Sequence, residues 1–315
     1  MGRPNVTSAD VAAAAGVSRA TVSYVLNGVD ARVSDETRQR VLEAARNLGY
    51  TPNAMASALR AGRTSVVIFA LPNWPLGPVL GAFLSGCVGA LDQLGYTPLV
   101  HFVHVSGPDG LQKACDRVRP VGVIAPATNL DPERIEALRG NGTRGFVLFS
   151  RSPIPDVPTF ILDQGRIGAV AIEHLAERGH TRMLALTPLD PQLQELGETR
   201  LAGAQAAAER LGVTLTHVPA DDLPRGLESK PTGVYAFNDE LALGVLDALP
   251  EGVALIGSDD SPAARLSHPR LTTIQFGHPD NPARIARTLH AQIEGERIDE
   301  PVIASTPSVV QGETT

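Results

Sequence analysis

The sequence predicts a small all-α head followed by a larger α/β body in two lobes, with parallel sheets covered by helices on both faces. Two patterns predict this fold class. Short helical patterns fill the first 50 residues, and apolar runs alternate with helical patterns from residue 64 onward. Such alternation is typical of βαβ units and hence of parallel sheets.

Composition sets the outer limits. The chain has 315 residues, 43% of them hydrophobic and 19% charged, which is enough for two or three domains with cores of their own. No apolar run approaches the ~18 residues that a membrane span needs, and two cysteines are too few for a disulfide framework. We therefore expect a cytoplasmic protein with no membrane partner.

Charge is divided unevenly along the chain. Residues 1–63 hold eight arginines and five acidic residues, a net charge of +3, so the remaining 252 residues carry −10. A basic head on an acidic body is expected where one end binds phosphates and the other is kept away from them.

The head reads as three helices. Thr7 with Asp10 has the spacing of a capping box, which predicts a first helix over residues 8–15. After a glycine turn, Ser18 caps a second helix over 19–27. A third helix begins after Ser34 and ends at Gly49, so its range is 35–48. The first two helices form a helix-turn-helix.

A helix-turn-helix places the start of its second helix in the DNA major groove. Arg19 can bond a guanine edge in bidentate fashion, and the Ala20 methyl can contact a thymine methyl. Four hydroxyl side chains suit phosphate contacts: Thr7, Ser18, Thr21 and Ser23. The alternative is a small helical packing module whose polar face is merely solvated.

A short alanine-rich segment follows the head. Asn53 caps residues 54–61, a helix too short to be stable alone, so it folds only against a symmetry mate or DNA. Leu59 suits a wedge into a base step from the minor groove, and Ala56 permits close helix approach. The alternative is a plain linker.

The body contains two series of four apolar runs, which indicate two lobes. The first series comprises residues 65–70, 97–102, 121–125 and 145–149. The second comprises residues 159–162, 183–186, 233–236 and 253–256. Helical patterns lie between them, at 79–94, 110–118, 132–139, 168–178, 198–211 and 239–249.

Catalytic signals are missing from the body. It has no phosphate-binding glycine loop, no zinc-binding helix motif and no nucleophile elbow. We therefore expect no enzyme activity, no cofactor and no metal.

Polar clusters instead follow three predicted strands, where ligands bind in open α/β sheets. They are Asp163 with Gln164, Asn238 with Asp239, and Ser258 with Asp259 and Asp260, while Arg200 lies at the start of a nearby helix. Carboxylates, an amide and a guanidinium suit a neutral polyhydroxy ligand. The alternative is helix capping, which we favour for Asp239 and Asp260.

The head resembles a known family. VTSADVAAAAGVSRATVSYVLNG, followed by VSDETRQRVLEAARNLGYTPNAMASALRAGRT, is similar to the DNA-binding head and hinge of the LacI/GalR family of bacterial transcription regulators. The resemblance implies that Arg19 and Ala20 read bases, that residues 53–61 form a hinge helix and that Leu59 opens the operator centre. Tyr24 stands where the family usually has Arg or Lys, so the operator preference cannot be carried over.

The body resembles the same family. AFNDELALGVLDAL and VALIGSDDSPAARLSHPRLTTI are similar to its effector-binding body, which has the periplasmic-binding-protein fold. The resemblance implies effector contacts from Arg200, Asn238 and Asp259, with Asp163 near the crossing between lobes and Trp74 stacked on a sugar ring or packed at the rim. Residues 150–162 and 188–197 depart from the family pattern.

The resemblance also divides the chain. It implies a helix-turn-helix domain over 1–52, a hinge helix and linker over 53–63, and an effector-binding and dimerisation domain over 64–315. Within that last domain, lobe 1 takes about 64–162 with 277–293. Lobe 2 takes about 163–276 with 294–315.

The implied function is sequence-specific transcription regulation. We expect a repressor that binds a pseudo-palindromic double-stranded DNA operator as a homodimer and is switched by a small, sugar-like effector in the interlobe cleft. The alternatives are an activator of the same family, a cytoplasmic sugar-binding protein without a regulatory role and an enzyme of doubly wound fold.

Overall fold

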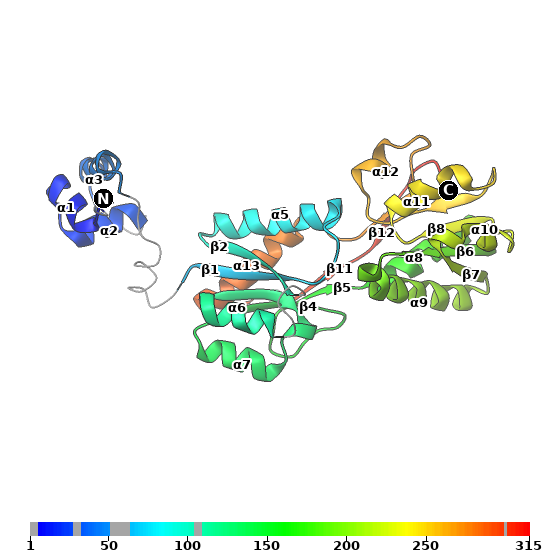
Figure 1. The fold of residues 1–315 in the computed structure, drawn as a ribbon, viewed down its shortest axis with the longest axis horizontal. Helices are drawn as coiled ribbons and strands as arrows, with labels where there is room; N and C mark the ends of the chain where they lie inside the picture. Colours follow the sequence, from blue (N-terminus) through cyan, green and yellow to red (C-terminus); the bar gives the residue numbers. More distant parts are fainter. Residues whose placement is uncertain (1–5, 28–32, 51–63, 104–108, 299–300) are drawn as a thin grey trace. The chain divides into compact units, whose positions relative to one another are not determined.

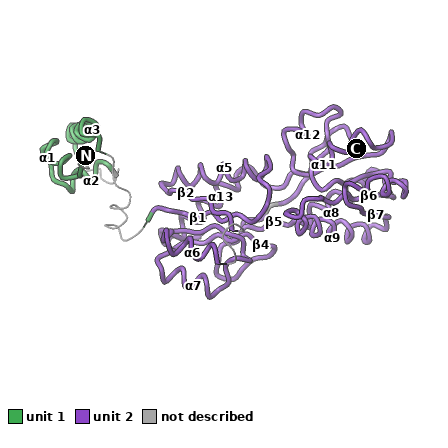
Figure 2. The backbone as a smooth tube through the Cα atoms, viewed as in Figure 1, with its two compact units in different colours: residues 1–64 green, residues 65–315 purple. Residues whose placement is uncertain are grey.

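The structure is a computed structural model that describes residues 6–27, 33–50, 64–103, 109–298 and 301–315. The chain forms two compact units, residues 1–64 and 65–315 (Figure 2). The predicted hinge segment lies outside the described residues. No helix within the described ranges is long and apolar enough to cross a membrane.

The head unit is a three-helix bundle. Its helices are α1 (Ser8–Ala15), α2 (Arg19–Asn27) and α3 (Asp35–Leu48), as the sequence predicts (Figure 1). Val11, Val22 and Val41, one from each helix, are fully buried together with small alanines. Such small side chains let the helices pack closely, and α2 keeps its opposite face exposed.

The first lobe of the body is a six-stranded parallel sheet in the order β11-β5-β4-β3-β1-β2. The strands are β1 (Val66–Leu71), β2 (Thr97–Phe102), β3 (Gly122–Pro126), β4 (Gly145–Ser150), β5 (Thr159–Leu162) and β11 (Val302–Ser305). One face is covered by α5 (Pro78–Gln93) and α13 (Asn281–Glu294). The other is covered by α6 (Gly110–Val118) and α7 (Pro132–Gly140). Figure 1 shows both layers.

The second lobe is a four-stranded parallel sheet in the order β7-β6-β8-β9. Its strands are β6 (Arg182–Thr187), β7 (Thr214–Pro219), β8 (Gly233–Ala236) and β9 (Ala254–Ile256). One face packs against α8 (Gln164–Glu177) and α9 (Gln194–Leu211), and the other against α10 (Leu223–Leu227), α11 (Asp239–Val245) and α12 (Pro262–Leu266). A short antiparallel pair, β10 (Thr273–Gln275) with β12 (Ser308–Val310), completes the lobe.

Three expectations about the strands were wrong. Residues 159–162 were grouped with the second series, but β5 pairs with β4 in the first sheet, as the lobe boundary at about residue 162 implies. Residues 294–315 were assigned to the second lobe, where β12 does lie, but β11 pairs with β5 in the first. Strand β7 was not predicted, because half of the residues of this edge strand are exposed and it lacks a continuous apolar run. Strand pairing depends on partners distant in sequence, which local patterns do not reveal.

Helices α8 and α9 pack with their backbones in contact. A side chain on Gly168 would overlap the backbone of Arg200, and one on Gly203 would overlap the backbone of Gly165. Only glycine permits this approach. The contact fixes the position of Arg200 relative to the first turn of α8.

We predict that Gly203→Ala lowers the free energy of unfolding of the body by roughly 1–3 kcal/mol, since overpacking forces the two helices apart. Gly89→Ala is the matched control, because that helical glycine faces open space and alanine is the better helix former by up to ~1 kcal/mol. Urea unfolding of both variants measures the difference. Equal stability of the two variants would contradict the close packing.

Candidate functional sites

The start of α2 is held by its cap. The Ser18 hydroxyl oxygen accepts the Thr21 backbone N–H at 3.0 Å and lies 2.9 Å from the Thr21 hydroxyl. Ser18 therefore caps the helix as the sequence predicts, and both hydroxyls already take part in one local hydrogen bond.

One face of α2 is turned outward. Arg19, Ala20 and Tyr24 are exposed, and Tyr24 shows 46% of its surface, whereas Val22 and Val25 on the opposite face are buried. A guanidinium, a methyl group and a phenol thus share one accessible surface at the beginning of a capped helix. Ser23 beside them is half-buried.

Thr7 lies at the start of α1, outside this face. Its backbone N–H and its hydroxyl both donate to Asp10 Oδ2, at 2.8 and 2.7 Å. These hydrogen bonds, first of all the one from the hydroxyl, lower the pKa of the Asp10 carboxyl. A phosphate contact by the Thr7 hydroxyl would have to compete with Asp10. The predicted contacts Asn53, Ala56 and Leu59 lie outside the described residues.

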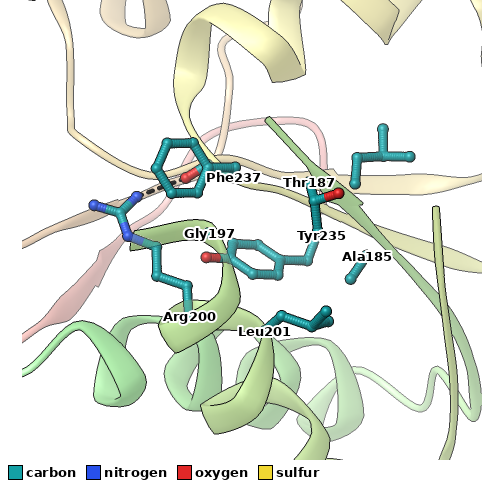
Figure 3. A pocket seen from close by; sticks show the side chains of 8 residues that line it. Ala185, Thr187, Gly197, Arg200, Leu201, Tyr235 and Phe237 are labelled. Atoms are coloured by element: carbon teal, nitrogen blue, oxygen red, sulfur yellow. Dashed lines mark hydrogen bonds between the residues drawn. The ribbon is translucent and has the colours of Figure 1, made fainter. Parts of the chain in front are cut away.

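A second site is built around Arg200, which is only 4% exposed. Its Nε donates to Gln164 Oε1 at 2.7 Å. Its Nη1 donates to the Phe237 carbonyl at 2.6 Å (Figure 3). The same Nη1 donates to Ser258 Oγ at 2.8 Å. The guanidinium carbon also lies 4.4 Å from the ring centre of Phe237 and 5.1 Å from that of Phe276. Aromatic faces and hydrogen-bond acceptors together compensate the buried charge.

Asp259 lies beside this guanidinium, with Oδ1 3.7 Å from Arg200 Nη1. Burial raises the pKa of the Asp259 carboxyl to about 7, against the opposing effect of Arg200, and the nearby Asp239 and Glu240 raise it further. Near neutral pH the site therefore holds a fixed cation beside a carboxyl group that can be charged or protonated.

Asp239 and Asp260 do not cap helices, so that expectation was wrong. The caps are Asn238 on α11 and Ser261 on α12. Asp239 is buried and accepts the Ser261 backbone N–H at 2.7 Å and the Thr273 hydroxyl at 2.5 Å. Because Asp239 lies one residue past the cap, its side chain reaches across to the loop that carries Asp259.

Asp260, in contrast, is bound by the exposed Arg265 side chain, whose Nε donates to Oδ1 at 2.9 Å. The ion pair joins the loop before α12 to the exposed Arg265 of that helix. Asp260 is therefore held by Arg265, with its own side chain only 8% exposed, and Asp259 alone of the two neighbours meets Arg200.

A small cavity adjoins Arg200 between α9 and the second sheet (Figure 3). Its volume of about 10 Å³ is enough for about one water molecule. The buried Tyr235 hydroxyl lines it and has no hydrogen-bond partner within the described part of the chain. The other lining residues are Ala185, Leu186, Thr187, Gly197, Arg200, Leu201 and Phe237.

The remaining predicted ligand contacts have local roles as well. Asp163 is exposed and caps α8 by accepting the Arg166 backbone N–H at 2.9 Å. Asn238 is half-buried and accepts the Leu241 backbone N–H at 2.9 Å. Trp74 is half-buried in the loop between β1 and α5. The structure thus brings Arg200 and Asp259 into contact, while the other three occupy separate strand ends.

Sequence reasoning missed the two aromatic rings around Arg200. Phe237 directly follows β8, and Phe276 directly follows β10. The available signal was an aromatic residue next to a polar cluster at a strand end, but a single ring at such a place is more often core packing. Only the fold shows that both rings face the same guanidinium.

Comparison with known proteins agrees with both units. Residues 7–53 match the family model "Bacterial regulatory proteins, lacI family", and residues 172–315 match "Periplasmic binding protein-like domain". The regulator reg1 of Streptomyces lividans is 31% identical over 97% of this chain and 96% of its own length. The ribose operon repressor of Escherichia coli is 30% identical, over 85% of this chain and 87% of its own length.

Solved structures show the same fold. The Lac repressor dimer bound to operator and an anti-inducer matches with a TM-score of 0.75 and 24% identity, over 99% of both chains. The complex of the regulator CelR with cellobiose matches with a TM-score of 0.63 and 26% identity, over 99% of this chain and 100% of the other.

The fold and the two sites define a helix-turn-helix DNA-binding protein with a periplasmic-binding-protein-like body. The chain belongs to the LacI family of bacterial transcription regulators. This family consists of regulators and not of enzymes.

We predict that Asp259→Asn changes the pH dependence of stability. The raised pKa means that the folded protein binds a proton more readily than the unfolded chain, so this group makes the wild type less stable as pH rises from about 4 towards 7. Between pH 5 and pH 8 the variant should therefore gain at least about 1 kcal/mol relative to wild type, since one pKa unit corresponds to ~1.4 kcal/mol.

Chemical unfolding at the two pH values measures this gain. Asp221→Asn, which removes an exposed carboxylate from the same lobe, is the control. A stability difference between Asp259→Asn and wild type that is the same at pH 5 and pH 8 would count against the raised pKa.

Proposed function

We propose that this protein is a ligand-controlled repressor that binds a pseudo-palindromic operator as a homodimer. The observation that carries the proposal is the outward face of α2, on which Arg19, Ala20 and Tyr24 are exposed at the start of a capped helix. In a helix-turn-helix this is the surface that enters the major groove. The charges of the chain agree with this, because the basic head is attracted to DNA and the acidic body is repelled by it.

The proposed division of contacts follows from side-chain chemistry. Arg19 reads a guanine edge, the Ala20 methyl contacts thymine, and the Tyr24 phenol bonds a phosphate or a base edge. Phosphate contacts come from Thr7, Ser18, Thr21 and Ser23. In the hinge, the family resemblance assigns DNA contacts to Asn53, Ala56 and Leu59.

Relatives support a repressor with a sugar-like ligand. They include the ribose operon repressor and the HTH-type transcriptional repressor PurR of Vibrio vulnificus. Solved relatives hold cellobiose, D-xylulofuranose or ribose. The dimeric state is supported by the operator-bound Lac repressor dimer. The proposed DNA partner supports a cytoplasmic location, which we include in the proposal.

The body supplies a site for such a ligand. Arg200 and Asp259 offer a donor and an acceptor 3.7 Å apart, which suits hydroxyl groups because each hydroxyl both donates and accepts. Asp163, Asn238 and Trp74 complete the proposed contact set. Ligand binding changes the balance between two lobe arrangements, and the hinge transmits the change to the heads.

The test is selection of bound duplexes from a randomised library, at low and near-physiological salt. We expect an enriched palindrome with a flexible central pyrimidine–purine step, which is lost in Leu59→Ala. Binding that is salt-sensitive but blind to sequence, or no binding at all, would overturn the proposal.

We predict that Arg19→Ala reduces discrimination at one base pair of each half-site by about 1–3 kcal/mol, the usual range for a bidentate contact to guanine. Arg40→Ala, an exposed arginine on α3, is the control. It should at most weaken all sequences equally. Titration of the selected duplex and of its single-base variants distinguishes a loss of discrimination at one base pair from uniform weakening. An unchanged base preference in Arg19→Ala would show that Arg19 does not read a base.

We further predict that a neutral sugar, tested from a panel that includes ribose and cellobiose, raises the thermal unfolding midpoint of the wild type and does not raise that of Asp259→Ala. The same sugar should change the affinity of the wild type for the selected duplex. A sugar that stabilises both proteins equally would place the binding site elsewhere.

A further inference from the structure

Three side-chain hydrogen bonds join the two lobes at one place. Gln192 Nε2 donates to Asn73 Oδ1 at 2.8 Å. Arg151 Nη2 donates to Glu195 Oε1 at 3.2 Å and to Thr199 Oγ1 at 3.0 Å. Asn73 and Arg151 follow strands of the first lobe, and the other three residues precede or begin α9 in the second. We call these five residues the interlobe clasp.

Three of the five clasp residues lie in the two segments that the family resemblance does not cover. Arg151 lies in the proline-rich stretch 150–162, and both Gln192 and Glu195 lie in 188–197. Two unusual segments, about 40 residues apart in sequence, thus contact each other across the lobes.

The second-lobe side of the clasp is locally well held. Asp190 caps the turn before α9 by accepting the Gln192 backbone N–H at 2.9 Å. The Thr199 hydroxyl donates to the Glu195 carbonyl at 2.8 Å, which leaves its oxygen to accept from Arg151. Gly197 lies against Pro188 so closely that a Cβ there would be only 2.8 Å from the ring.

Helix α9 connects the clasp to the ligand site. Thr199 of the clasp immediately precedes Arg200, and Glu195 lies one turn earlier on the same helix. A ligand that rearranges the hydrogen bonds of Arg200 therefore acts on the helix that carries half of the clasp. On the first-lobe side of the clasp, Asn73 directly precedes Trp74, which is a proposed ligand contact.

We propose that the interlobe clasp stabilises the arrangement of the lobes described here and that this arrangement favours operator binding. This inference rests on the proposed repressor function. The side chains of Arg151 and Glu195 are 68% and 81% exposed, so each contact is weak. The clasp therefore adjusts the population of two arrangements without locking either one.

The first experiment measures operator affinity without ligand, on the selected duplex. Arg151→Ala should weaken binding about two- to fivefold, the range of an exposed ion pair. Glu195→Gln should weaken it less, and the double variant should equal Arg151→Ala, because the partners act as one unit. Arg225→Ala is the matched control, since its ion pair with Asp222 is 75% exposed on the arginine side and lies within one lobe.

Unchanged or tighter binding by Arg151→Ala, or effects of the two single variants that multiply in the double variant, would overturn the proposal. The thermal unfolding midpoint of each variant, measured in parallel, should stay at the wild-type value, which shows that lost affinity does not come from unfolding.

The second experiment tests the contact itself, independently of DNA. Asn73→Cys with Gln192→Cys should be joined by a short bifunctional thiol reagent in the ligand-free protein. The two native cysteines are buried, and burial raises the pKa of both thiols to about 12, so they compete little. Failure to cross-link overturns the clasp.

The cross-linked protein should bind the selected duplex at least as tightly as the same variant before cross-linking, and clearly weaker binding overturns the proposal. If the wild type binds no duplex, the repressor function fails, while cross-linking still decides whether the lobes meet at these residues.

Discussion

The structure of the second lobe depends on the contacts that compensate one buried guanidinium, that of Arg200. An arginine that is 4% exposed is tolerated only if its charge and its N–H groups are compensated. Arg200 obtains this from Gln164 at the start of α8, the Phe237 carbonyl after β8, and Ser258 after β9. Three separate strand and helix ends are thereby held at one point, and this is the point where parallel sheets bind ligands.

The same requirement shapes the neighbouring loop. Asp259 and Asp260 have φ angles of 118° and 50°, which are unfavourable for residues with a side chain. Asp239 offsets this by holding the loop through Ser261 and Thr273. The loop can then present Asp259 to Arg200 and Asp260 to Arg265. Two identical side chains in succession acquire different environments.

What the sequence predicted was local. Ser18, Ser34 and Gly49 marked the ends of the head helices because capping depends on residues within one turn. The position of β11 beside β5, and the two rings around Arg200, depend on residues far apart in sequence. The resemblance pointed to Arg200 and Asp259 as partners of one site. It did not reveal Phe237 or Phe276, because only the fold brings both rings to the Arg200 guanidinium.

The two proposed sites use arginine in opposite ways. Arg200 is oriented by protein acceptors before any ligand arrives, so a neutral ligand meets a fixed donor and loses little freedom of the protein on binding. Arg19 stands on an exposed helix face, where its side chain is accessible to solvent. A ligand site that must distinguish small hydroxyl patterns gains from rigidity. A DNA-reading side chain that must also slide over other sequences gains from remaining solvated until the correct base pair is reached.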